Sequence, residues 1–154
     1  MASNPYGAYL ESKVFTASPL QLVHLAYEGA IEVIGEARLH LANKRIQERA
    51  AAITKAQRIL TELQSSLDVQ KGGQIATRLG QLYDYMQRRL IEANFKQADE
   101  PLAEVQRLLE TVDQAWKEIA AAEMPVPQAV VAATASPWAS SSDSFAYSRA
   151  EYTF

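Results

Sequence analysis

One apolar stripe, running from residue 75 to residue 93, does most to limit what this chain can fold into. Its members recur at steps of four and three, namely Ile75, Leu79, Leu82, Met86, Leu90 and Ala93. This spacing places them on one face of an α-helix. Tyr83 and Tyr85 lie beside the stripe, and each ring has an apolar body and a polar tip. The stripe needs other helices to cover it, and the two rings either complete that core or line a groove for another molecule.

Two helices are expected before this stripe. The first covers residues 18–43, and its start carries Ser18 and Gln21 at the spacing of a capping box. The second covers residues 46–69 and is expected to end at Lys71-Gly72-Gly73, because adjacent glycines favour a turn. The helix that bears the stripe then runs from residue 75 to about residue 97.

A fourth helix follows a short polar break. Asp99 or Glu100 is expected at its N-cap, with Pro101 in its first turn. Its apolar residues step by three and four: Leu102, Val105, Leu109, Val112, Trp116 and Ile119. The pattern again predicts one buried face.

Four amphipathic helices joined by short connections predict an all-α fold, an antiparallel four-helix bundle. We expect the bundle to occupy residues 18–122, after a short N-terminal arm of residues 1–17. Residues 123–154 are rich in Ala, Ser and Pro and contain few charges. Because proline opposes a continued helix, we expect a flexible C-terminal tail there.

The arm and the tail each have two interpretations. Tyr6 and Tyr9 indicate that the arm either caps one end of the core or acts as a lid over a binding groove. The tail is either disordered or folds back onto an apolar groove. The second interpretation rests on its aromatic residues, namely Trp138, Phe145, Tyr147, Tyr152 and Phe154.

The composition excludes several classes of protein. No run approaches the roughly 18 apolar residues of a membrane span. The chain has no cysteine, so it has no disulfide and no zinc–sulfur site. A formal net charge of −3 gives no broad attraction to nucleic acid. We therefore expect neither membrane insertion nor nucleic-acid binding.

No catalytic or metal-binding motif is present. His24 and His40 are the only histidines, and they are too far apart on one helix to share a metal ion. The chain lacks a phosphate-binding glycine loop and the Glu-x-x-His pairs of di-iron bundles. Arg88 and Arg89, together with Arg78 and Lys96, are expected to pair with Asp84, Glu92 or the fourth helix's Glu104 and Glu110. We predict that the chain is not an enzyme and takes no cofactor or metal. The alternative is a catalytic pair of carboxylates that the fold brings together from distant parts of the sequence.

The first helix carries more apolar surface than one core seam needs. A second stripe lies beside its first and consists of Leu20, Val23, Tyr27, Ile31 and Ile34. On the second helix, Ile59 lies off the apolar seam. Gly29 and Gly35 each cost about 1 kcal/mol against alanine within a helix, which we interpret as a sign of close packing. The excess favours a partner that covers it.

The ordered motifs of this chain resemble those of the flagellar secretion chaperones for flagellin. The first-helix motif consists of Ala17-Ser18-Pro19, Gln21-Leu22 and residues 25–30. Later motifs follow in the same order: residues 55–60, residues 82–86 with Arg88-Arg89-Leu90, Glu92-Ala93-Asn94, residues 102–105 and Ala115-Trp116-Lys117. The likeness spans about residues 6–119. The segment LYDYM with the Arg-Arg-Leu that follows it is the most specific part.

This resemblance implies a cytoplasmic, non-enzymatic export chaperone with a helical-bundle fold. The implied client is the disordered C-terminal segment of flagellin, which such a chaperone keeps from premature polymerisation and delivers to the flagellar type III export apparatus. Export apparatus components and an anti-sigma factor are further implied partners. The family's N-terminal arm can occupy part of the binding surface, and its position matches Tyr6 and Tyr9 here.

We therefore predict a partner-binding surface built from aromatic, aliphatic and polar residues of the arm and of the first three helices. Its members are Tyr6, Tyr9, Leu20, Val23, Tyr27, Ile31, Ile59, Tyr83, Tyr85, Arg88, Arg89 and Asn94. Leu63, Met86 and Val112 are expected in the interior. A self-associating helical-bundle module is the alternative function, and we expect a monomer or a weak homodimer.

Overall fold

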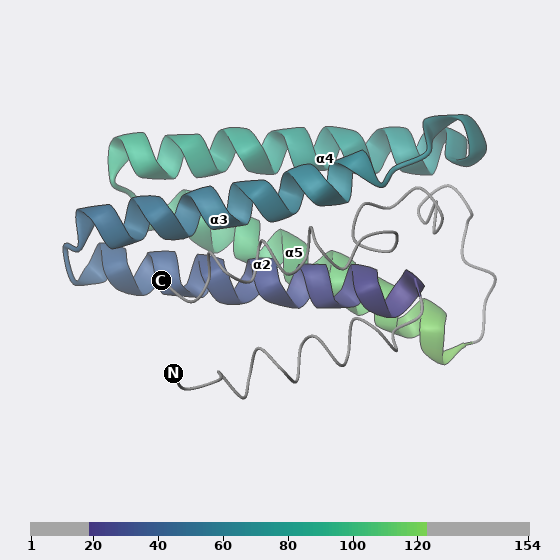
Figure 1. The fold of residues 1–154 in the computed structure, drawn as a ribbon, viewed down its shortest axis with the longest axis horizontal. Helices are drawn as coiled ribbons and strands as arrows, with labels where there is room; N and C mark the ends of the chain where they lie inside the picture. Colours follow the sequence, from purple (N-terminus) through teal and green to yellow (C-terminus); the bar gives the residue numbers. More distant parts are fainter. Residues whose placement is uncertain (1–18, 123–154) are drawn as a thin grey trace, which may run out of the picture.

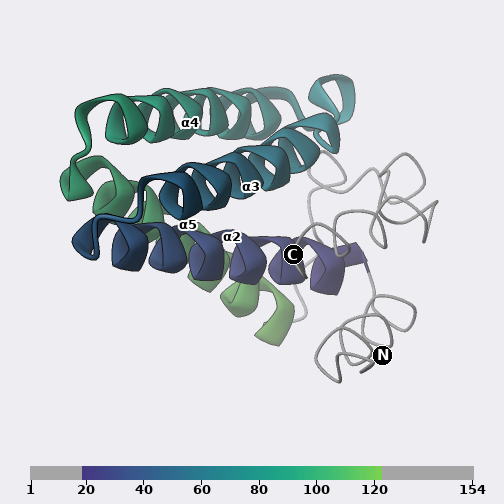
Figure 2. The same ribbon diagram turned by 60° about the vertical axis from the view of Figure 1, so that its left-hand side comes forward.

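The computed structural model describes residues 19–122, which fold into four α-helices (Figure 1). Helix α2 spans Pro19–Ala42, α3 spans Ile46–Ser65, α4 spans Val69–Lys96 and α5 spans Asp99–Ala121. Successive helices run in opposite directions, as Figures 1 and 2 show. Helices α2 and α4 each pack against both α3 and α5, so they lie diagonally opposite each other. The prediction of an all-α, antiparallel four-helix bundle is confirmed.

Some of the sequence predictions fall outside the described residues. These are the arm of residues 1–17 with Tyr6 and Tyr9, the capping role of Ser18, and the tail of residues 123–154. Within residues 19–122, none of the helices is both long enough and apolar enough to cross a membrane.

The core is built from the inward faces of all four helices. Its largest fully buried side chains are Tyr27, Ile34, Leu60, Leu63, Tyr83, Met86, Leu90, Leu102 and Leu109. Leu63 and Met86 are therefore interior, as expected, whereas Val112 is only partly buried and packs against the edge of the core. Ile75, which opens the stripe described above, is 49% exposed. The stripe is fully buried at Met86, Leu90 and Ala93 and only partly buried at Leu79 and Leu82.

The boundary between α3 and α4 differs from the expectation. Helix α3 ends at Ser65, and α4 begins at Val69 rather than near residue 75. The Asp68 side chain causes the early start, because its carboxylate accepts a hydrogen bond from the Lys71 backbone N–H at 3.1 Å and serves as the N-cap. In place of the expected break, α4 has a kink at Gly73, where φ is 52° and ψ is −124°.

The start of α5 also differs by one residue. Ala98 is the N-cap and makes no side-chain capping bond. Asp99 and Glu100, which the sequence placed at the cap, instead lie in the first turn together with Pro101. Their negative charges are favourable there because the N-terminus of a helix carries partial positive charge.

Close packing does not account for the two glycines inside α2. A Cβ atom added at Gly29 would lie 3.7 Å from Cδ1 of Ile59, and one at Gly35 would lie 3.7 Å from Nε2 of Gln106. Both distances are ordinary van der Waals contacts. The expectation that close approach requires these glycines is therefore not supported.

Replacement of Gly73 by alanine should destabilise the bundle. A side chain at φ 52° and ψ −124° meets a backbone penalty of about 1–3 kcal/mol. Gly72 lies in the same segment without a positive φ, so Gly72→Ala is the matched control and should be neutral or slightly stabilising. Urea unfolding of the two variants measures the difference. Equal midpoints would show that the kink is not needed.

Candidate functional site

Three of the predicted partner-binding residues lie in the core. Val23 and Tyr27 on α2 and Tyr83 on α4 are buried. The hydroxyls of the two tyrosines are hydrogen-bonded to each other, and their ring centroids lie 6.5 Å apart. These side chains pack in the interior of the bundle and contribute almost nothing to its exposed surface. The question whether Tyr83 completes a core or lines a groove is thus answered in favour of the core.

Burial changes the acidity of both tyrosine hydroxyls. Removal from water disfavours the charged phenolate and raises the pKa of Tyr27 from 10.0 to about 12, against a smaller opposing effect of its hydrogen bond with Tyr83. Burial, followed by the nearby Tyr27 hydroxyl, raises the pKa of Tyr83 still further. Both rings therefore stay neutral well above the pH at which an exposed tyrosine ionises.

Three predicted aliphatic residues lie at the edges of the core. Leu20 and Ile31 on α2 and Ile59 on α3 are half-buried and pack against the core. Ile59 lies beside Gly29, so it is located at the junction of α2 and α3. Each of these side chains keeps part of its apolar surface open. They are the members of the predicted set that offer apolar contact area to a partner.

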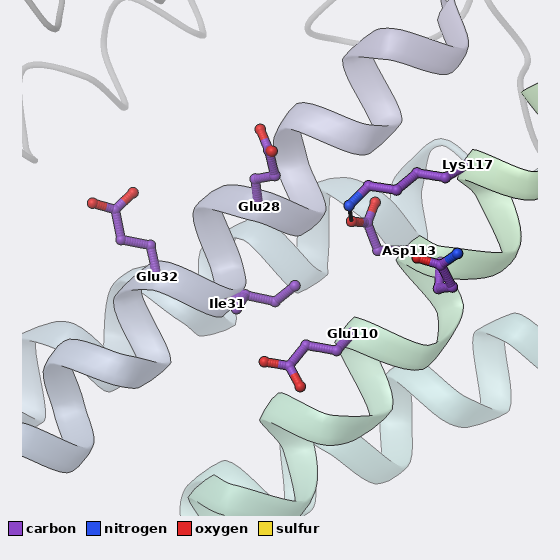
Figure 3. Close-up of a pocket in the computed structure, with 7 residues that line it drawn as sticks. Glu28, Ile31, Glu32, Glu110, Asp113 and Lys117 are labelled. Carbon is purple, nitrogen blue, oxygen red and sulfur yellow. Dashed lines mark ion pairs between the residues drawn. The ribbon is translucent and has the colours of Figure 1, made fainter.

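Ile31 belongs to a groove between α2 and α5. This groove has a volume of about 480 Å³, and Figure 3 shows Ile31 extending from α2 into the space that faces α5. Its lining residues are Glu28, Ile31, Glu32, Glu110, Asp113, Gln114 and Lys117. The groove therefore combines one aliphatic side chain with several carboxylates.

The sequence analysis missed the polar group that closes one end of this groove. The Asp113 side chain is only 5% exposed, and its carboxylate contacts Nδ1 of His24 at 2.6 Å and Nζ of Lys117 at 3.2 Å. His24 also contacts Glu28 at 3.2 Å. Asp113 falls between Leu109 and Trp116 on the buried face of α5. An acid at that position signals a partner on a neighbouring helix, and this signal is readable from the sequence.

The polar residues predicted on α4 take different positions. Arg89 faces α5, and its guanidinium contacts Glu92 at 2.6 Å and both Glu100 and Glu104 at 2.7 Å. The Tyr85 hydroxyl donates to the same Glu104 carboxylate. The expected ion pairs of Arg89 with Glu92 and Glu104 are confirmed. Tyr85 and Arg89 together join α4 to α5.

This network shifts the acidity of its carboxylates. The hydrogen bond from Tyr85, and then Arg89, lowers the pKa of Glu104. The Lys96 ammonium, followed by Arg89, lowers the pKa of Glu92. The hydrogen bonds that the Arg89 guanidinium donates to Glu100 and then to Glu92 raise its pKa. All three groups therefore carry their charges at neutral pH.

The other two predicted polar residues do not join this network. Arg88 is exposed on the outer face of α4. Asn94 is half-buried and faces α3, where its Oδ1 accepts a hydrogen bond from Nε of Arg49 at 3.3 Å. The predicted set is thus divided among the core, the α2–α3 and α2–α5 junctions, and three sides of α4. It does not form one continuous patch on the described residues.

The sequence analysis also missed several exposed apolar side chains on α3 and α4. Phe95 is 86% exposed and Ile91 is 58% exposed, four residues apart on the outer face of α4. Ile46, in the first turn of α3, is 56% exposed. The signal is present in the sequence, because both α4 residues lie on the side of the helix away from Met86 and Leu90.

Within residues 19–122, no three or more His, Asp or Glu side chains are grouped so that they could hold a metal ion.

Comparison with known proteins gives one consistent result. A family model described as flagellar protein FliS matches residues 2–123. The flagellar secretion chaperone FliS of Salmonella typhimurium is 41% identical over 111 residues, which cover 71% of this chain and 82% of the relative. That of Bacillus subtilis is 35% identical over 115 residues, covering 75% and 85%. The flagellar secretion chaperone FliSB of Pseudomonas aeruginosa is 36% identical over 110 residues, covering 71% and 87%.

The buried tyrosine pair predicts a loss of stability at alkaline pH. Above pH 10 the tyrosines of the unfolded chain lose their protons while Tyr27 keeps its proton to about pH 12. The folded state then binds more protons than the unfolded state, so the free energy of unfolding falls by roughly 1–3 kcal/mol between pH 10 and 12. Denaturant unfolding at a series of pH values measures this fall.

The double variant Tyr27→Phe/Tyr83→Phe is the control. Removal of both partners of a buried hydrogen bond can be nearly neutral at pH 7, and the variant should lose less stability above pH 10. If the free energy of unfolding depended on pH in the same way for the variant and the parent protein, the buried tyrosine pair would not be the cause of the alkaline loss of stability.

The Arg89 network predicts a position-specific effect on thermal stability. Arg89→Met removes the cation that three carboxylates share, so these carboxylates repel one another and the melting temperature should fall by several degrees. Arg88→Met removes an exposed charge from the adjacent residue and should change the melting temperature little. Added salt should reduce the difference in melting temperature between the two variants, since salt screens the repulsion among the carboxylates. Equal melting temperatures at low salt would show that the network contributes nothing to stability.

Proposed function

Because this chain belongs to the flagellar protein FliS family, we propose that it is a cytoplasmic export chaperone for flagellin. In this proposal it binds the disordered C-terminal segment of flagellin, prevents premature polymerisation and delivers the subunit to the flagellar type III export apparatus. It catalyses no reaction and requires no cofactor. Export apparatus components and an anti-sigma factor are its further proposed partners.

One observation carries the proposal. The family match covers residues 2–123 and therefore includes all four helices of the bundle. The relatives that support it are named flagellar secretion chaperones, and they align with this chain over more than four fifths of their own length. The name describes the function of the relatives, and the client and route of this chain are proposed from it.

The bundle has a surface suited to such a client. A disordered segment that folds on binding lays apolar side chains, at helical spacing, into grooves between helices. Ordering the segment costs about 2–5 kcal/mol, so the surface must offer a large apolar area. Leu20, Ile31 and Ile59 are half-buried and pack against the core. Ile31 lies at the junction of α2 with α5 and Ile59 at its junction with α3. We propose that these three side chains form the apolar contacts on the described residues.

The remaining predicted residues take supporting roles in this proposal. Val23, Tyr27 and Tyr83 are buried, and we assign them to the core beneath the junctions rather than to the contact surface. Tyr6 and Tyr9 lie outside the described residues and stay proposed as a lid over the grooves. Arg88, exposed on α4, is proposed to contact polar groups of the client.

Self-association is the competing function. The exposed Ile46, Ile91 and Phe95 favour it, because exposed apolar side chains can pair two copies. Sedimentation velocity separates the two functions. The chaperone proposal expects a monomer or weak dimer that becomes a 1:1 complex with a flagellin C-terminal fragment, whereas a tight dimer that ignores the fragment would support self-association.

Titration calorimetry with the flagellin C-terminal fragment tests the proposal. We expect a 1:1 complex with a negative heat-capacity change, because apolar surface is buried. Ile59→Gln should weaken binding by about tenfold or more, the equivalent of about 1.4 kcal/mol. Thr54→Gln, an exposed change on the same helix, should leave the affinity unchanged. The proposal fails if the parent protein shows no binding heat and no heat-capacity change.

A further inference from the structure

Three of the six large apolar side chains that are exposed on the described residues, namely Ile46, Ile91 and Phe95, lie toward one end of the bundle. This is the end where α3 begins and α4 ends (Figure 2). The Arg49–Asn94 hydrogen bond fixes the register there, because it ties the first turns of α3 to the last turn of α4. Ile46 precedes Arg49 by about one turn, and Phe95 is adjacent to Asn94. We refer to Ile46, Ile91 and Phe95 as the end patch.

The end patch lies among charged residues of both signs. The carboxylates of Asp99 and Glu100 at this end pair with Arg38 and Arg89, whereas other exposed cations lie closer to the patch. Lys44 and Arg45 immediately precede Ile46, and Arg88 lies on the same outer side of α4 as Ile91 and Phe95. All three cations are exposed. Glu48 is the acidic residue in the first turn of α3. A complementary segment would carry aromatic or aliphatic side chains and a net negative charge.

A segment of the same chain has this composition. Residues 138–154 contain five aromatic side chains: Trp138, Phe145, Tyr147, Tyr152 and Phe154. Their charged residues are Asp143, Arg149 and Glu151, so the segment has a net charge of −1. The family model ends at residue 123, so the function proposed from the family does not require this segment.

The segment is long enough to reach the end patch. Helix α5 has 23 residues and ends at the opposite end of the bundle, so the return distance is about 35 Å at 1.5 Å per residue. Residues 123–144, which precede Phe145, span about 70 Å when fully extended. A flexible chain of that length has a root-mean-square span of roughly 25 Å. The required distance therefore lies well within reach.

The area of the end patch favours an intramolecular occupant over a second copy. Three aliphatic or aromatic side chains, partly exposed, present roughly 300–400 Å². A stable interface buries about 800 Å² on each partner. A tethered segment needs much less, because its effective concentration at the surface is in the millimolar range.

We propose that residues 138–154 fold back onto the end patch of the same molecule. Their aromatic side chains cover Ile46, Ile91 and Phe95, and their carboxylates lie near Lys44, Arg45 and Arg88. The contact shields the apolar residues that would otherwise join two copies of the protein. Apart from Arg88, which is also proposed to contact the client, this contact uses no residue of the proposed flagellin-binding surface.

Paramagnetic relaxation enhancement in the full chain tests this contact. The sequence has no cysteine, so Ser148→Cys provides a single site for a nitroxide label between Tyr147 and Tyr152. We expect a loss of peak intensity at the backbone amides of residues 46, 91 and 95. A label at Gln128→Cys should spare these amides, since residue 128 is closer to the end of α5.

Variants of the surface supply the matched comparison. Ile91→Gln/Phe95→Gln should abolish the intensity loss. Val69→Gln/Ile75→Gln changes two exposed apolar side chains near the start of α4 and should preserve it. Circular dichroism melts establish that both variants fold. No intensity loss in the parent chain, or a loss centred on residues 69–75, would overturn the proposal.

A mixed sample separates contacts within one chain from contacts between chains. Isotope-labelled protein without a nitroxide is combined with unlabelled protein that carries it. The proposal expects no intensity loss in this mixture, because the contact forms within each molecule. Loss at residues 46, 91 and 95 would instead assign the end patch to a second copy and contradict the proposal.

Discussion

The hydrogen-bonded pair of Tyr27 and Tyr83 is a polar contact in the core that constrains how the helices of this bundle are arranged. It joins α2 and α4, the helices that lie diagonally opposite each other, through the middle of the core. Apolar side chains alone tolerate small shifts between helices, whereas two buried hydroxyls must meet or remain unsatisfied. The pair therefore fixes how far α2 and α4 can slide or rotate. The half-buried side chains at the helix junctions owe their positions to that fixed core.

The sequence predicted the fold well because the fold follows from local periodicity. The stripes of α3, α4 and α5 gave the helices and most of the core. The boundary between α3 and α4 was harder, because Asp68 caps α4 while Gly72 and Gly73, the conspicuous turn signals, lie inside that helix. A cap made by one side chain competes with a glycine pair, and the sequence pattern gives no measure of which one prevails.

The candidate site was less accessible from the sequence for a geometric reason. Periodicity assigns a residue to a face of its own helix but does not show which other helix covers that face. Tyr27 and Tyr83 are buried because the faces of α2 and α4 meet across the core, while Ile31 and Ile59 lie at the edge of the core, beside α5 and α2 respectively. Ile91 and Phe95 do not belong to the apolar stripe. Their spacing from Met86 and Leu90 nevertheless predicts the opposite face of the helix, where the structure shows them exposed.

We propose that this bundle keeps apolar surface for another chain while its core stays closed. Hydrogen–deuterium exchange of the full chain, with and without a flagellin C-terminal fragment, tests this claim most directly. We expect the client to slow amide exchange along α2 and around Ile59. The already slow exchange of amides near Tyr27 and Tyr83 should not change. Absence of protection along these junctions, or faster exchange in the core on binding, would contradict it.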